Sequence, residues 1–122
     1  MEETPIIEYA RISECCRPSY TLVIYTDGIV KKLDECSKKI GEISQSKLEE
    51  LLDILKNNGF FSMNDKYHPL IKPICILMER ITYINNGQTK SVEASTAGNT
   101  PDNFFRIRDE IRNVERGAKW SN

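Results

Sequence analysis

Alternating side-chain types along the first third of the chain predict β-strands. Residues 20–25, with the sequence YTLVIY, are all strand-favouring types and alternate as in a strand whose two faces differ. Asp27 and Gly28 then supply the positive φ values that a tight hairpin turn requires, and residues 29–33 form the returning strand. Two shorter strands are expected on either side of this hairpin, over residues 6–12 and 40–43.

Apolar residues at helical spacing predict a helix directly after these strands. Ser44 or Ser46 can cap its first turn, and Gly59 can adopt the left-handed conformation that ends a helix. Phe60 or Phe61 is then expected to fold back against the last turn. Four leucines recur at positions i, i+3, i+4 and i+7 and share one face: Leu48, Leu51, Leu52 and Leu55.

The second half of the chain repeats this order of hairpin and helix. A long, mostly apolar strand over residues 74–84 and its return over residues 88–95 are joined by Asn85-Asn86-Gly87, a strong hairpin turn. The strand over residues 74–84 is apolar on both faces. It is therefore expected to be either central and covered twice, or buried by a partner.

The last helix begins near Pro101, which suits the first helical position after a cap at Asn99 or Thr100. Gly117 ends the helix, and Trp120, just beyond it, is expected to pack back onto the body of the protein. One face of this helix is apolar and consists of Phe104, Ile107, Ile111 and Val114.

Together these elements predict an α+β fold. Hairpins imply antiparallel pairing, and two helices that are each apolar on one side imply a sheet with one covered face. The expected architecture is a two-layer sandwich, in which an antiparallel sheet of five or six strands carries two helices on one face. With no linker long enough to separate parts, residues 1–122 are expected to form a single globular domain.

The charge balance weighs against several classes of function. Seventeen basic and eighteen acidic residues leave a formal net charge of -1, so no overall field attracts nucleic acid. No apolar run approaches the ~20 residues that a membrane span needs. The first residues are acidic and do not form a secretory signal, which predicts a cytoplasmic protein whose cysteines are mainly reduced.

The arginines of the last helix could in principle meet phosphate groups. Arg108, Arg112 and Arg116 recur at i, i+4 and i+8 and form a stripe beside the apolar face. However, the helix carries four acidic residues alongside its four arginines, so it has no net charge. Ion pairing on a solvated face explains this pattern, and no nucleic-acid partner is expected.

The adjacent cysteines Cys15 and Cys16 leave three interpretations open. They can be small, semi-buried residues that introduce the first hairpin, with Pro18 marking the turn into it. They can form a redox-responsive pair, because the neighbouring Arg17 favours a thiolate. A metal site is the third interpretation. Zinc sites usually offer Cys-x-x-Cys pairs, and because the spacing here differs, no metal is expected.

The connection over residues 62–73 is polar and contains two prolines, and it holds the only histidine, His68, next to Tyr67. His68 is expected to be an ordinary loop residue, because the sequence nominates neither a nucleophile nor an orienting acid for it. Long ordered loops often carry binding sites, however, so a ligand pocket that contains Tyr67 and His68 is the alternative.

Motifs of common enzyme classes are not found in the sequence. It contains no glycine-rich phosphate loop, no His-Glu-x-x-His and no Gly-x-Ser-x-Gly. Each glycine stands singly, at a position that a turn, a strand or a helix cap explains. We therefore expect no catalytic residues and no cofactor.

The run from Pro18 to Val30, with the pattern P-x-Y-x-L-x-I-Y-x-D-G-x-V, resembles the opening of an uncharacterised small-domain family, domain of unknown function 6438. Later features fit the same family: Ile43-Ser44, residues 48–55, Gly59-Phe60-Phe61, Asn86-Gly87, Lys90-x-Val92, Pro101 and Trp120. Relatives often carry a cysteine directly before the proline, where this chain has Arg17, so a disulfide found in exported relatives is not expected here. The resemblance implies a fold and brings no activity with it.

The leading hypothesis for function is a non-catalytic protein-interaction or regulatory module. Its partner would be another protein or a second copy in a homodimer, bound at an open sheet edge or on the sheet face away from the helices. The alternatives are a small-molecule binder that uses Tyr67 and His68, and a regulatory protein whose thiols Cys15 and Cys16 respond to oxidation.

Overall fold

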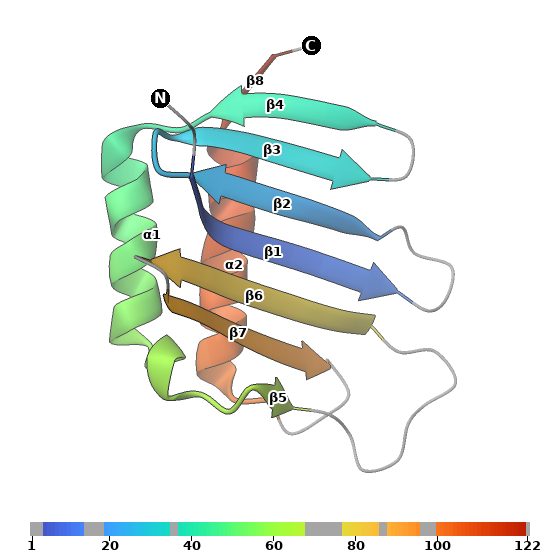
Figure 1. The fold of residues 1–122 in the computed structure, drawn as a ribbon, viewed down its shortest axis with the longest axis vertical. Helices are drawn as coiled ribbons and strands as arrows, with labels where there is room; N and C mark the ends of the chain where they lie inside the picture. Colours follow the sequence, from blue (N-terminus) through green and yellow to red (C-terminus); the bar gives the residue numbers. More distant parts are fainter. Residues whose placement is uncertain are drawn as a thin grey trace.

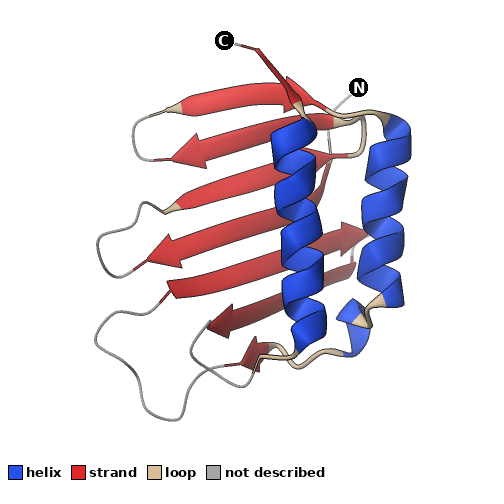
Figure 2. Cartoon of the chain, turned by 180° about the vertical axis from the view of Figure 1, so that it is seen from behind, coloured by secondary structure: helices blue, strands red, loops and turns tan. Residues whose placement is uncertain are grey.

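The residues that the structure describes form one eight-stranded sheet with two α-helices on one side of it (Figures 1 and 2). This computed structural model describes residues 4–13, 19–34, 37–67, 77–85, 88–95 and 100–121. In chain order the elements are β1 (Pro5–Ser13), β2 (Tyr20–Tyr25), β3 (Ile29–Asp34), β4 (Lys38–Glu42), α1 (Gln45–Asn57), the 3-10 turn η1 (Phe60–Ser62), β5 (Lys66–Tyr67), β6 (Leu77–Asn85), β7 (Gln88–Ser95), α2 (Asp102–Gly117) and β8 (Lys119–Ser121).

The strand order across the sheet is β5-β7-β6-β1-β2-β3-β4-β8. The six strands expected from the sequence are all present and pair antiparallel with one another. The expected count of five or six strands is wrong, because β5 and β8 extend the sheet at its two edges, and β5 pairs with β7 in parallel. These edge strands have only two and three residues, which is too short for an alternating pattern to show.

The turn between β2 and β3 forms as its sequence predicts. Gly28 has a φ of 90°, and the carboxylate of Asp27 accepts a hydrogen bond from the Ile29 N–H at 3.1 Å. The carbonyl of Gly28 also accepts from the Ile43 N–H at 2.8 Å. A Cβ at position 28 would lie 2.6 Å from the Ile43 carbonyl oxygen, so this close approach requires glycine.

The ends of α1 are fixed by a serine and a glycine. The Ser44 side chain accepts from the Lys47 N–H at 3.2 Å, so of the two expected caps Ser44 is the one used. After the helix, Gly59 is left-handed with a φ of 70°. Phe60 then folds back and is fully buried, whereas Phe61 is 49% exposed. Only one of the two adjacent rings can enter the core at this bend.

The start of α2 differs from the expected cap. Pro101 itself is the cap residue, and Asp102 occupies the first helical position. The hydroxyl of Thr100 donates to the Ser95 carbonyl at 2.7 Å and thereby ties the helix entry to the end of β7 instead of capping the helix.

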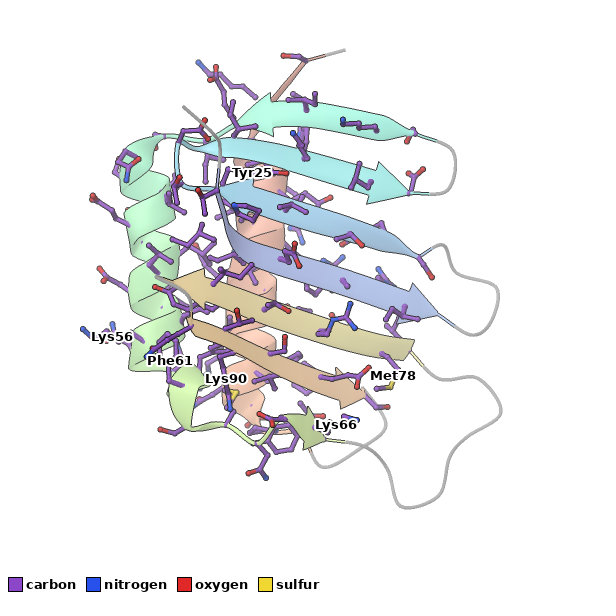
Figure 3. All side chains as sticks on the ribbon, viewed as in Figure 1. Tyr25, Lys56, Phe61, Lys66, Met78 and Lys90 are labelled. Atoms are coloured by element: carbon purple, nitrogen blue, oxygen red, sulfur yellow. The ribbon has the colours of Figure 1, made fainter. Side chains whose placement is uncertain are left out.

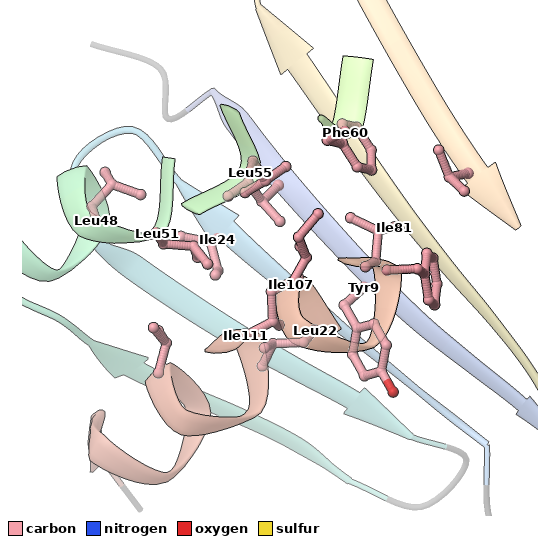
Figure 4. Close-up of a cluster of buried hydrophobic side chains, with 14 of the residues drawn as sticks. Tyr9, Leu22, Ile24, Leu48, Leu51, Leu55, Phe60, Ile81, Ile107 and Ile111 are labelled. Carbon is pink, nitrogen blue, oxygen red and sulfur yellow. The ribbon is translucent and has the colours of Figure 1, made fainter. Parts of the chain in front are cut away.

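The core lies between the helices and one face of the sheet (Figure 4). Leu51 of α1 and Ile111 of α2 are both 0% exposed, as the apolar stripes predict. Removal of each such side chain from water contributes roughly 1.5–3 kcal/mol to folding. The other buried members from the helices are Leu48, Leu55, Phe104, Ile107 and Val114.

The C-terminal strand β8 is held on β4 by its tryptophan. Trp120 pairs with Gly41 across the two strands, and its indole N–H donates to the Glu115 carbonyl at 3.0 Å. A Cβ at position 41 would lie 2.8 Å from the Trp120 ring. Trp120 therefore packs back onto the body of the protein as expected, over a strand position where only glycine leaves room.

Candidate functional site

Of the residues singled out from the sequence, only Tyr67 lies in the described part of the chain. Cys15, Cys16 and His68 lie outside the described residues, and so do Cys36 and Cys75. Their roles stay predictions.

Tyr67 is described, and the structure gives it a structural contact. It lies on β5, half-buried against the core, and its hydroxyl accepts a hydrogen bond from the Asn64 N–H at 2.9 Å. This bond closes the turn that leads into β5. Tyr67 therefore anchors the edge of the sheet.

The sheet face away from the helices, which we call the open face, is covered by no element among the described residues (Figure 1). Successive strand residues point to opposite sides, so the neighbours of buried core residues lie on this face. Three of its apolar side chains, Ile12, Leu33 and Ile40, are 37%, 38% and 41% exposed. The strand register adds Ala10, Val23, Tyr25, Ile29, Met78 and Ile84, of which Tyr25 and Met78 are labelled in Figure 3.

Polar residues separate the apolar ones on the open face. Thr82 and Ser91 lie opposite each other on β6 and β7 and share a hydrogen bond of 2.8 Å. The Lys31 ammonium lies 4.8 Å from the centre of the Tyr25 ring. Such mixing is typical of a sheet face that meets water part of the time.

Charges on the open face differ between its two halves. Strands β2, β3 and β4 contribute Lys31, Lys38 and Glu42, a net charge of +1. Strands β1, β6 and β7 contribute Glu8, Arg80 and Glu93, a net charge of -1. Lys119 of β8 and Lys66 of β5 add one positive charge at each edge, so the half that contains β4 stays the more positive.

Short strands cover part of each sheet edge, and on the outer side of β7 residues 88–92 have no strand partner among the described residues. β8 covers residues 40–42 of β4, and the remaining residues of β4 are the exposed Lys38 and Lys39. At the other edge β5 covers Glu93 and Ala94 of β7. Short edge strands and lysines oppose edge-to-edge pairing. Of the two surfaces that the sequence left open for a partner, the open face is therefore the better candidate.

A buried polar network lies on the other side of the sheet, beneath α2. Glu79 of β6 is 2% exposed, and its two carboxylate oxygens accept from the Tyr9 hydroxyl and from the Arg108 guanidinium, the latter at 2.9 Å. Arg108 also contacts Asp109 at 2.9 Å and lies 4.9 Å from the centre of the Phe105 ring. Both oxygens of the buried carboxylate are thus occupied, which is how a charge survives in a core.

These contacts shift two pKa values. Burial, followed by the hydrogen bond to Glu79, raises the pKa of Tyr9 well above the ordinary tyrosine value. Burial alone would lower the pKa of Arg108, but the charge of Glu79 and its hydrogen bond outweigh that effect and raise it. Tyr9 is therefore held protonated and Arg108 charged, which stabilises the Glu79 carboxylate between them.

A second group of polar residues continues this network toward β3. Lys32 forms an ion pair with Glu115 of α2 at 2.8 Å and lies 4.8 Å from the centre of the Tyr20 ring. The Tyr20 hydroxyl donates to Glu115 at 3.4 Å, and burial followed by the charge of Glu115 raises the pKa of Tyr20. Within the described residues, Arg11 Nε is a buried nitrogen without an acceptor. Lys32 therefore binds α2.

Two surface grooves flank the helices. One, of about 500 Å³, lies between the start of α1 and the end of α2, and both acids and lysines line it, among them Glu42, Lys47, Glu110 and Lys119. The other, which we call the Phe61 groove, has a volume of about 690 Å³ and is lined by Lys56, Phe61, Tyr83, Gln88, Thr89 and Lys90. Only the Phe61 groove combines an exposed aromatic ring with lysines and no acidic lining residue.

Sequence reasoning missed both the buried network and the Phe61 groove. Glu79 stands between Leu77 and Ile81, which face the helices, and a lone carboxylate at such a position indicates a buried ion pair. For the groove, the adjacent pair Phe60-Phe61 after a helix-ending glycine was the available signal, since both rings cannot be buried at one bend.

Comparison with protein-family models, with curated proteins and with solved structures found no match for this chain. The resemblance to domain of unknown function 6438 therefore stays a prediction. Among the residues that the structure describes, no three side chains of His, Cys, Asp or Glu converge as metal ligands. No described helix is long and apolar enough to span a membrane.

Proposed function

We propose that the protein is a non-catalytic interaction module that self-associates through its open face. The observation that carries this proposal is a sheet whose helix side carries the hydrophobic core while its other side keeps Ile12, Leu33 and Ile40 more than one third exposed. The buried network beneath α2 supports a non-catalytic role, because both oxygens of Glu79 are already occupied by protein groups.

A second copy fits the charge pattern of the open face. A two-fold axis parallel to the strands and above the β1–β2 boundary places the half that contains β4 over the half that contains β7 of the other copy. Lys31 and Lys38 then face the half that carries Glu8 and Glu93. The more positive half therefore meets the more negative half twice in each dimer.

The area of the open face suits a weak dimer. Six strands spaced about 4.8 Å apart and about 20 Å long cover roughly 600 Å², so two copies bury about 1,200 Å² in total. Specific interfaces begin near that size. Since polar side chains interrupt the apolar ones, we expect a dissociation constant in the micromolar range.

Size-exclusion chromatography with light scattering over about 5–500 µM protein tests the proposal. The expected result is a molar mass that rises from the monomer value of 14.1 kDa toward twice that value. The double variant Ile12→Glu/Leu33→Glu should stay monomeric, because it buries four carboxylates in the dimer. Phe61→Gln is the control, since it removes an apolar side chain that is even more exposed, at 49%, on the helix side of the sheet.

A wild-type chain that is monomeric at about 500 µM would overturn self-association through the open face. So would a dimer that the open-face variant leaves intact, because its contact would then lie elsewhere.

A further inference from the structure

The Phe61 groove displays an aromatic ring that is half exposed. The ring of Phe61 lies edge-on to Phe60, with centres 5.6 Å apart, and edge-on to Tyr83, with centres 5.1 Å apart. These contacts fix the orientation of the ring, yet 49% of the residue stays accessible. A ring that is held in place and half exposed is a ready stacking surface for another ring.

Two lysines flank the ring from different elements (Figure 3). The Lys90 ammonium of β7 donates to the Met63 carbonyl at 2.6 Å and to the Asp65 carboxylate at 3.1 Å, which holds it at the groove. An ammonium has three donors, so one is left for a ligand. The Lys56 side chain, in the last turn of α1, is exposed.

We propose that the Phe61 groove binds a small planar aromatic acid. The ring of the ligand stacks on Phe61, and its acidic group lies between the ammonium groups of Lys56 and Lys90. Gln88 adds an amide at the rim. A volume of about 690 Å³ is within the usual range for small-molecule sites.

The preference for an acid depends on the two lysines. The groove lies at the C-terminal end of α1, where free carbonyl groups carry partial negative charge and would repel an anion. No acidic residue lines this groove, whereas the groove at the other end of the helices has Glu42 and Glu110 opposite Lys47 and Lys119. Of these two grooves, the Phe61 groove is therefore the one that favours an anion, through Lys56 and Lys90.

The test is a titration of the full chain, labelled with nitrogen-15, by 2-naphthoate, followed by amide chemical shifts. Shifts are expected at residues 61, 83, 88 and 89, with a dissociation constant of about 1 mM for a probe of this size. Two further probes separate the ring from the charge. Cyclohexanecarboxylate lacks the aromatic ring and 2-naphthalenemethanol lacks the acid, and each should bind at least about fivefold more weakly.

Matched variants assign the binding to the named side chains. Phe61→Leu keeps an apolar side chain but removes the ring, and should weaken 2-naphthoate binding about tenfold. Lys56→Gln should weaken it about threefold, since this lysine is solvent-exposed. Lys47→Gln is the control, because it removes an exposed lysine at the other end of the same helix and should leave binding within about twofold.

Equal binding of 2-naphthoate and cyclohexanecarboxylate would overturn the proposal, and so would shifts confined to residues away from the groove. Equal effects of Lys56→Gln and Lys47→Gln would also overturn it, because the acid would then respond only to overall charge. The Phe61 groove is on the helix side of the sheet, so its failure and the failure of self-association through the open face are read separately.

Discussion

The two faces of the sheet are built from alternate residues of the same strands, yet their side chains differ in how far they are exposed. On β2 and β3 the helix side carries Leu22, Ile24 and Val30, each 0% exposed, while the open face carries Leu33 at 38%. On the helix side the Glu79 and Glu115 carboxylates contact Arg108, Lys32 and the Tyr9 hydroxyl. The open face mixes charged and apolar side chains. This difference shows that most of the apolar burial that stabilises the fold lies on one side of the sheet. The other side is the one available for a binding function.

The largest expected effect comes from comparing two Leu→Ala substitutions, one on each face of the sheet. Leu22→Ala should lower the free energy of unfolding by about 3–4 kcal/mol, because it leaves a cavity between the sheet and α2. Leu33→Ala, on the neighbouring strand but on the open face, should cost less than about 1 kcal/mol. Urea denaturation at low micromolar protein, where the proposed dimer is dissociated, measures both. Equal losses would mean that a further part of the chain covers the open face.

The second prediction concerns the buried carboxylate on the helix side. Arg108→Met should lower the free energy of unfolding by about 2–4 kcal/mol, because Glu79 stays buried without its cation. The added variant Glu79→Gln removes that charge and should recover at least half of the loss.

Chemical denaturation of both single variants and the double variant measures this coupling. Additive losses would show that the two side chains act independently.

Sequence patterns were sufficient for the elements that bury a periodic face. The stripe that contains Leu51 and the one that contains Ile111 predicted both helices, and alternation, apolar runs and hairpin turns predicted the six longer strands. Asp27-Gly28 predicted the turn because its chemistry is local. The α+β class follows from these elements alone.

Features that depend on contacts between distant residues could not be predicted in this way. The pairing of β5 with β7 follows from the path of the chain after η1, and β8 follows from Trp120 lying over Gly41. The network of Tyr9, Glu79 and Arg108 joins residues up to 99 positions apart along the chain, and no pattern in a single sequence pairs them. The candidate surfaces needed the structure for the same reason, since each is assembled from several elements.

The third prediction concerns the sheet edge formed by β4 and β8. Gly41→Ala should lower the free energy of unfolding by about 1–3 kcal/mol, because the new Cβ would collide with the Trp120 ring and displace β8. Displaced Trp120 is more exposed, so its fluorescence maximum should shift to longer wavelength. Gly117→Ala is the matched control, because a Cβ there meets no atom within 4 Å. An unchanged Gly41→Ala spectrum would mean that β8 does not depend on this contact.

The smallest expected effect is a loss of stability at alkaline pH. It arises from Tyr9, which lies on the helix side of the sheet. The pKa of Tyr9 is raised in the folded protein above its ordinary value of 10.0, chiefly by burial and then by the hydrogen bond to Glu79. Above pH 10 the unfolded chain has lost this proton while the folded chain keeps it. The folded state then binds more protons, so its stability falls as the pH rises, by up to ~1.4 kcal/mol per pH unit.

The variant Tyr9→Phe isolates this contribution. It should be less stable than the wild type at pH 8, where the hydroxyl still donates to Glu79, but its stability should fall less steeply above pH 10 because position 9 no longer titrates. Tyr25→Phe is the control, since Tyr25 lies on the open face and its loss should leave the slope unchanged. Urea denaturation between pH 8 and pH 11.5 measures the three slopes. If Tyr9→Phe and the wild type share one slope, the hydroxyl of Tyr9 is not protected by the core, and the two faces of the sheet differ less in their electrostatics than the buried network implies.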